Sequence, residues 1–144
     1  MRVEVSTTIK RPIEDVFAVM SDSTNRPKWQ SSVSEMTKTS DGPIGVGTIW
    51  HAISKLFGRR VEGDAEYTEF EVNRTFSMKS TTPFPTTMAF TFESVAGGTR
   101  VDQLVDAEPS GLYRLAGPLL TTGARRDMQK YLDSLRDLME ADAL

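Results

Sequence analysis

Residues 87–106 read TMAFTFESVAGGTRVDQLVD, and this stretch indicates the fold. In two runs within it, successive side chains alternate between one face and the other. This period of two residues is typical of a β-strand with one buried face. Gly97 and Gly98 separate the runs and supply the backbone freedom that a tight turn needs. The stretch therefore predicts an antiparallel hairpin with strands over residues 87–95 and 99–106. The side chains placed on its inner face are Met88, Phe90, Phe92, Val101, Gln103 and Val105.

The same alternation continues upstream, where turn residues such as Asp41-Gly42-Pro43 separate short segments. Period two, combined with the positions of the aromatic and methionine residues, selects the face of each segment that points inward. The pattern predicts four further strands, over residues 33–39, 48–57, 60–70 and 75–80. Their inward side chains include Trp50, Tyr67, Phe76 and Met78.

The chain begins with another alternating run, Arg2 to Ile9, which predicts a half-buried strand. A helix is expected directly after it. Pro12 suits a first helical turn, and Glu14 and Asp15 favour the positive end of the helix dipole. A second, short helix is expected through Arg26-Pro27-Lys28-Trp29.

The chain beyond Pro109 is predicted to be helical, with a kink at Gly117-Pro118, because proline removes a hydrogen bond inside a helix. Beyond the kink an apolar stripe recurs at the helical period, and charged residues lie off it. We expect this stripe to pack on the sheet. Its members are Leu120, Ala124, Met128, Tyr131, Leu132, Leu135, Leu138 and Met139.

Together these elements predict an α+β fold. A seven-stranded curved antiparallel sheet is expected to pack on a long C-terminal helix, with two short helices after the first strand. The 144 residues suffice for one hydrophobic core, and no repeat or linker indicates a second. Residues 1–144 are therefore expected to form a single domain.

Several short phrases of the sequence resemble the SRPBCC or START-like superfamily, in its polyketide cyclase/dehydrase and lipid-transport branch. The phrases are IKRPIEDVF at 9–17, PKW at 27–29, GVGT at 45–48, FE at 92–93, GGTRV at 97–101 and LDSLR at 132–136. Their order and spacing carry the resemblance, which spans essentially the full chain. It implies a helix-grip fold that holds lipids, sterols, polyketides, hormones or other apolar molecules. Some members are cyclases, dehydratases or hydroxylase subunits, and the superfamily has no universal catalytic motif.

The predicted C-terminal helix carries small side chains in its first turns, at Gly117, Thr121 and Ala124. A curved sheet that faces small side chains leaves space unless a ligand fills it, because protein interiors are close-packed. We therefore expect a cavity between these turns and the strands. Each lining residue taken alone is also explained as ordinary core. The expected ligand-binding residues are Trp50, Tyr67, Phe76, Met78, Met88, Phe90, Phe92, Gln103, Leu120, Thr121, Ala124 and Met128.

The alternation of the strand places one polar side chain, Gln103, on the same inward face as Val101 and Val105. Its amide either orients a ligand or bonds to the protein backbone. Tyr67 and Tyr131 offer hydroxyls that either face the cavity or reach solvent. His51, the only histidine, points outward if Trp50 points inward, and a register shifted by one residue would reverse both.

The composition argues against several functional classes. Seventeen basic and twenty acidic residues give a net charge of −3, so a broad positive surface for nucleic acid is not expected. Without cysteine, and with one histidine, the chain lacks the ligands of a usual structural zinc site, and we expect no metal or cofactor. Glu62, Asp64 and Glu66 share one strand face, which is typical of a solvated surface. Neither a GxSxG nucleophile nor a phosphate-binding glycine loop is present, so catalytic residues stay unassigned.

No apolar run approaches the ~20 residues that span a bilayer, and a secretory signal is missing, so we expect a cytoplasmic protein. Two functions remain open. The first is non-catalytic binding of a small apolar, ring-containing molecule, lipid-like or polyketide-like. The second is a polyketide cyclase or dehydratase acting in the same cavity, with Gln103, Tyr67 and His51 orienting and protonating the substrate. The sequence favours binding, because it shows no convergent acid and base groups.

Overall fold

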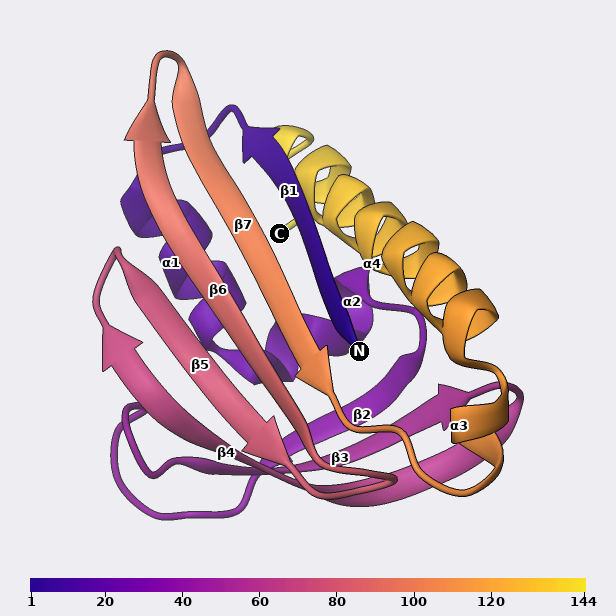
Figure 1. The fold of residues 1–144 in the computed structure, drawn as a ribbon. Coiled ribbons are helices and arrows are strands. Elements are labelled where there is room, and N and C mark those ends of the chain that lie inside the picture. The colour runs from indigo at the N-terminus through magenta and orange to yellow at the C-terminus, as the bar shows by residue number, and fades with distance from the viewer.

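A computed structural model describes residues 1–144, and its centre is a strongly curved antiparallel sheet with the strand order β1-β7-β6-β5-β4-β3-β2 (Figure 1). All seven strands lie where the alternating pattern predicts them, within one or two residues at each end. The strands are β1 (Arg2–Ile9), β2 (Val33–Lys38), β3 (Ile49–Leu56), β4 (Arg59–Glu71), β5 (Thr75–Ser80), β6 (Thr86–Val95) and β7 (Gly98–Ala107).

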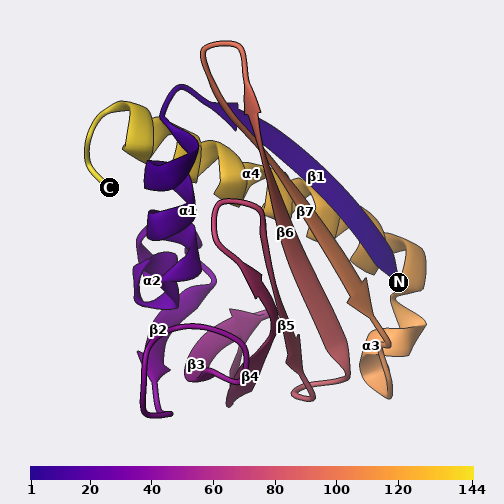
Figure 2. The same ribbon diagram turned by 90° about the vertical axis from the view of Figure 1, so that its left-hand side faces the viewer.

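The helices cover the concave side of this sheet. Helix α1 (Ile13–Ser21), the 3₁₀ turn η1 (Ser23–Asn25) and helix α2 (Arg26–Trp29) follow β1 and lie across from β5 and β6 (Figure 2). The long helix α4 (Gly117–Glu140) runs beside β1, with Leu132, Leu135 and Met139 completely buried (Figure 1). The predicted α+β helix-grip fold is thereby confirmed. No helix is both long and apolar enough to cross a bilayer.

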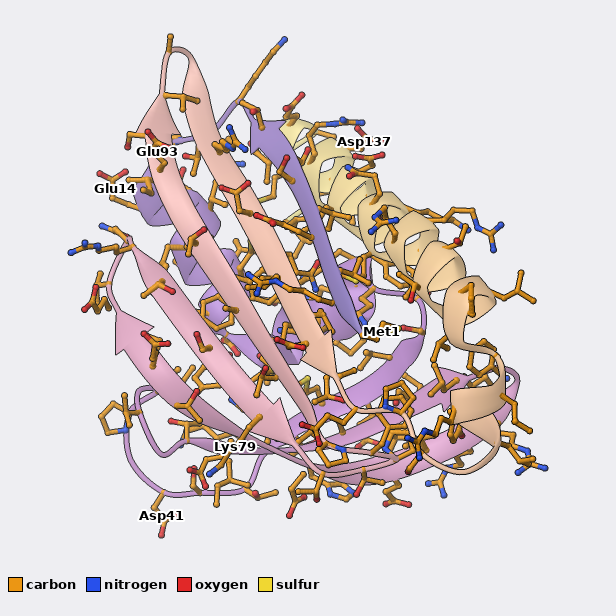
Figure 3. The ribbon with its side chains drawn as sticks, viewed as in Figure 1. Met1, Glu14, Asp41, Lys79, Glu93 and Asp137 are labelled. Atoms are coloured by element: carbon orange, nitrogen blue, oxygen red, sulfur yellow. The ribbon has the colours of Figure 1, made fainter.

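The hairpin of β6 and β7 has the predicted register. Phe90 pairs with Gln103, Met88 with Val105, and Phe92 with Val101, so the predicted inward side chains share one face. The face assignment is also visible in β5, where Phe76 and Met78 are buried. Lys79, which follows Met78 near the end of β5, points away from the concave side (Figure 3). Alternation is a local property of strands, which is why the sequence predicts it well.

The C-terminal helical region differs from its prediction at one point. The expected kink at Gly117-Pro118 is a break between a short helix, α3 (Leu112–Leu115), and α4, with Ala116 between them. Proline lacks a backbone N–H and suits the first turn of a helix, where no partner for that group exists. Pro118 therefore begins α4 instead of bending a continuous helix.

The core is built around aromatic rings on the concave face. Phe76 lies at its centre, with ring centroids 5.3 Å from Tyr67, 5.0 Å from Phe90 and 5.9 Å from Phe92. Phe17 of α1 meets Phe76 at 6.0 Å in an edge-to-face arrangement. Such contacts join α1 to the middle strands of the sheet. Charged side chains lie at the periphery, among them Asp41 in the β2–β3 loop and Asp137 on α4 (Figure 3).

Candidate functional site

A small cavity of about 170 Å³ opens on the concave face beside α2, against strands β2 to β6. Its wall combines apolar side chains with several polar groups. This is smaller than the ~300–1,000 Å³ of typical drug-sized sites, so it accommodates a molecule of about one ring. The lining residues are Arg26, Gln30, Val33, Met36, Ala52, Ser54, Val61, Gly63, Asp64, Ala65, Met78, Ser80, Thr82 and Met88.

Arg26 is the polar residue that distinguishes this cavity. It is the first residue of α2, and only 3% of its surface is exposed. The guanidinium carbon lies 5.4 Å from the ring centroids of both Trp29 and Phe90, and Nη1 donates to the Met88 sulfur at 3.4 Å. Nε and Nη2 have no hydrogen-bond partner, and no carboxylate forms an ion pair with this side chain. Burial lowers the pKa of Arg26, yet an arginine remains charged at neutral pH.

Gln103 lies next to this group. Its side chain is inside the sheet, 3% exposed, and Nε2 donates to the Met88 sulfur at 3.4 Å. The Met88 sulfur therefore accepts hydrogen bonds from both Arg26 and Gln103. Thioether sulfur is a weak acceptor, so both donors could gain from a better partner. The protein backbone does not occupy the Gln103 amide nitrogen.

Tyr67 has its hydroxyl fully engaged by the protein. It donates to the backbone oxygen of Ser21 at 2.8 Å and lies 2.6 Å from the hydroxyl of Ser23. Burial raises the pKa of Tyr67, so the phenol stays neutral. These bonds tie β4 to the end of α1. The hydroxyl is thus a structural group in this conformation.

The remaining predicted site residues divide between two places. Met78 and Met88 line the cavity. Six other predicted residues are buried but are not among those that line it, namely Trp50, Tyr67, Phe76, Phe90, Phe92 and Gln103. Leu120, Thr121, Ala124 and Met128 of α4 do not line it. Helix α4 packs along β1, so its first turns lie away from β3 and β4 (Figure 1). The cavity beside α2 is thus a different place from the predicted one beside residues 117–124, which stays a prediction.

Sequence reasoning missed Arg26 and the hydroxyl residues Ser54, Ser80 and Thr82. Arginine is normally exposed, so a single basic residue in a short polar helix gives no local signal of burial. The arginine is buried because α2 lies across the open side of the sheet (Figure 2). That placement depends on contacts between segments far apart in the sequence.

His51 lies on the opposite, outer face of the sheet, as predicted. Its Nδ1 is 2.9 Å from a carboxylate oxygen of Asp64, and its Nε2 is 2.8 Å from one of Glu62. Both ring nitrogens thus face acceptors, an arrangement that favours the protonated imidazolium. The hydrogen bond to Asp64, and then that to Glu62, raise the pKa of His51, and the bond to His51 lowers the pKa of Glu62. The imidazole is solvent-exposed and does not line the cavity.

We expect the pKa of His51 in the folded protein to exceed its ordinary value of 6.5. The raised pKa stabilises the fold fully below pH 6.5, and this contribution disappears as pH rises through the folded pKa. The lowered pKa of Glu62 acts in the opposite direction and stabilises above its ordinary 4.5, so the two contributions overlap between these values. An NMR titration of the imidazole protons measures the pKa directly, because the chain has one histidine. The double variant Glu62→Gln, Asp64→Asn should return it toward 6.5, and an unchanged pKa in that variant would contradict the assignment.

An exposed apolar area lies at another end of the molecule, where α3 meets the β3–β4 turn. Leu112, Leu115 and Leu119 are 75%, 84% and 81% exposed, and Phe57 is 63% exposed. The ring of Phe57 lies 6.0 Å from that of Tyr113. None of these residues lines the cavity of Arg26. The helical periodicity of the sequence did not indicate this area.

A family comparison agrees with this architecture. The model of the family "Polyketide cyclase / dehydrase and lipid transport" matches residues 1–140. The chain belongs to this family. The predicted resemblance is thereby confirmed. No curated protein sequence matches the chain significantly.

Solved structures show the same fold at low sequence identity. TTHA0849 from Thermus thermophilus has 17% identity and a TM-score of 0.83, with full coverage of both chains. The di-domain ARO/CYC StfQ from the steffimycin biosynthetic pathway has 13% identity and a TM-score of 0.79, with 99% of this chain aligned to 51% of that one. A START superfamily protein from Mycobacterium smegmatis has 13% identity and a TM-score of 0.72, with 98% and 95% coverage. At these identities the similarity establishes the fold of this family member.

Proposed function

We propose that this member of the polyketide cyclase / dehydrase and lipid transport family binds a small, largely apolar molecule in the cavity beside α2. The observation that supports the proposal is a wall that combines apolar side chains with the buried Arg26, whose charge has no carboxylate partner. Buried donors are nearly always paired in native proteins, so unpaired ones beside a cavity indicate where a ligand makes hydrogen bonds. The methionines Met36, Met78 and Met88 give the wall an adaptable shape.

The ligand is expected to be retained during purification. Native mass spectrometry of freshly purified protein should then show a population heavier than the chain alone, and denaturation should release the added mass. Arg26→Glu, which puts a carboxylate into the same wall, should reduce this population. An unchanged mass distribution in that variant would contradict binding in this cavity.

A polyketide cyclase or dehydratase is the second candidate function. It is supported by the description of the family and by the structural similarity to the ARO/CYC protein StfQ. In this case Arg26 would polarise a substrate carbonyl from one side of the cavity. Binding is preferred, because the ionisable groups lining the wall are Arg26 and the half-solvated Asp64, and no base stands opposite the arginine.

Replacing Gln103 distinguishes the two functions. Gln103→Leu keeps the volume and removes the amide, so the affinity for the ligand identified by mass spectrometry should fall by about 1–3 kcal/mol if the amide bonds that ligand. In an enzyme, turnover should fall more than affinity, because an orienting contact matters most in the transition state. A lower melting temperature with unchanged affinity would mean that Gln103 serves only the fold. Gln129→Leu is the matched control, since Gln129 bonds to Ser6 and Asp133 outside the cavity.

A further inference from the structure

We propose that the ligand of this cavity carries a carboxylate or a similar planar anion, and that the guanidinium group of Arg26 binds it. This inference rests on the proposed function and specifies the chemical class of the ligand. It follows from the pairing, the geometry and the surroundings of a single guanidinium group.

The charge of Arg26 has no counter-ion in the protein. Arg11, Arg60, Arg74, Arg100, Arg126 and Arg136 all form ion pairs with carboxylates at their exposed or half-exposed positions. The arginine that is completely buried forms none, although the chain has twenty acidic residues. Burying an unpaired charge is unfavourable by several kcal/mol, more than the ~2 kcal/mol that a desolvated cation–π contact returns. An anionic ligand supplies the missing partner.

The two free nitrogens are adjacent on one edge of the guanidinium plane. Nε and Nη2 present parallel N–H bonds, the geometry in which arginine donates to both oxygens of one carboxylate. The third nitrogen, Nη1, is turned toward the Met88 sulfur. The edge with Nε and Nη2 thus has no hydrogen-bond partner, although neighbouring protein atoms cover it in this conformation. A ligand with two acceptor oxygens matches this edge better than a single carbonyl does, and it reaches the edge when the guanidinium turns toward the cavity that Arg26 lines.

The rest of the wall agrees with an amphipathic anion. Val33, Met36 and Ala65 offer an apolar surface to the body of the ligand. The hydroxyls of Ser54 and Thr82 are additional donors, whereas the Ser80 hydroxyl donates to the backbone oxygen of Thr82 at 3.3 Å. Asp64 is the acidic residue in the wall, but its side chain is 67% exposed and accepts from His51 on the outer face. It does not neutralise Arg26. The volume of about 170 Å³ suits one ring together with its acidic group.

Cinnamate and cinnamide are suitable probes, because they have nearly the same shape and differ in the charge of the head group. In isothermal titration calorimetry at pH 7.5, the wild-type protein should bind cinnamate about 10- to 100-fold more tightly than cinnamide. Arg26→Met should abolish this preference, because cinnamate then loses more affinity than cinnamide. Arg26→Lys should retain a preference of only a few-fold, because lysine lacks the two-pronged edge. Lys28→Met removes the same charge from an exposed position of α2 and should leave the preference intact.

Thermal unfolding of the same variants gives a readout that does not depend on the probe. If Arg26 is kept for a ligand, Arg26→Met should melt at or above the wild-type temperature, because an unpaired buried charge is removed. A lower melting temperature of Arg26→Met, together with a preference for cinnamate that persists in this variant, would overturn the inference and make Arg26 a structural residue. Equal binding of both probes by the wild type overturns the anion preference while leaving the apolar cavity in place. Failure of the wild type to bind either probe overturns the proposed function and this inference with it.

Discussion

Replacing Phe76 by alanine is expected to lower the free energy of unfolding by about 4 kcal/mol, within the usual ~3–5 kcal/mol for a buried phenylalanine. The ring is completely buried and touches aromatic rings of α1, β4 and β6. Its loss leaves a cavity among rings that belong to three different elements, so no single side chain can move in to fill it. Urea unfolding followed by circular dichroism measures the change, and the slope with denaturant should stay constant.

Phe57→Ala is the matched control, because it removes the same ring from an exposed position at the β3–β4 turn. Its effect should stay within about 0.5 kcal/mol. A loss for Phe76→Ala no larger than that of the control would contradict the central place of Phe76 in the core.

Gly98→Ala is the second large effect, with an expected loss of about 3 kcal/mol or more. A methyl group at this position would collide with the carbonyl oxygen of Ile9 and lie 3.0 Å from its carbonyl carbon and 3.1 Å from Cα of Lys10. These are backbone atoms at the end of β1, so the strand itself must move. The movement would disturb Arg11, whose Nη1 donates to the backbone oxygen of Met139 at 2.8 Å and ties β1 to α4.

Gly45→Ala provides the comparison for this variant. No atom lies within 4 Å of a methyl group at Gly45, and the residue has no left-handed backbone conformation. Its melting temperature should remain close to that of the wild type, whereas Gly98→Ala should melt several degrees lower, at ~2–4 °C per kcal/mol. Equal melting temperatures for the two variants would contradict the prediction and show that the end of β1 can move away from β7 at little cost in free energy.

The Gly97-Gly98 pair shows how far local pattern extends. As a turn signal, this pair was sufficient to predict where β6 ends and β7 begins. The structure nevertheless requires glycine at the two positions for different reasons. Gly97 adopts a positive φ of 81°, which a turn requires, and Gly98 gives β1 room to approach β7. The second reason involves a segment far earlier in the chain, so no local rule contains it.

The sequence by itself determined the seven strands, because side-chain alternation is a property of each strand alone. It predicted the inward faces from the positions of the aromatic and methionine side chains, but a register shifted by one residue would have reversed Gln103 and His51. The structure decided this point, because it buries Gln103 and places His51 on the outer face.

Only the tertiary structure decided where the cavity lies and which charge it contains. The helix stripe placed small residues at Gly117 and Ala124, but packing of α4 along β1 left these turns outside the cavity of Arg26. Exposed Leu115 and Leu119 follow from the same packing, which leaves one side of α3 and the start of α4 uncovered. Arg26 became buried because α2 lies across the open face of the sheet. Burial of a charge depends on what surrounds it in three dimensions, and the residues that contact Arg26 come from β6 and from α2.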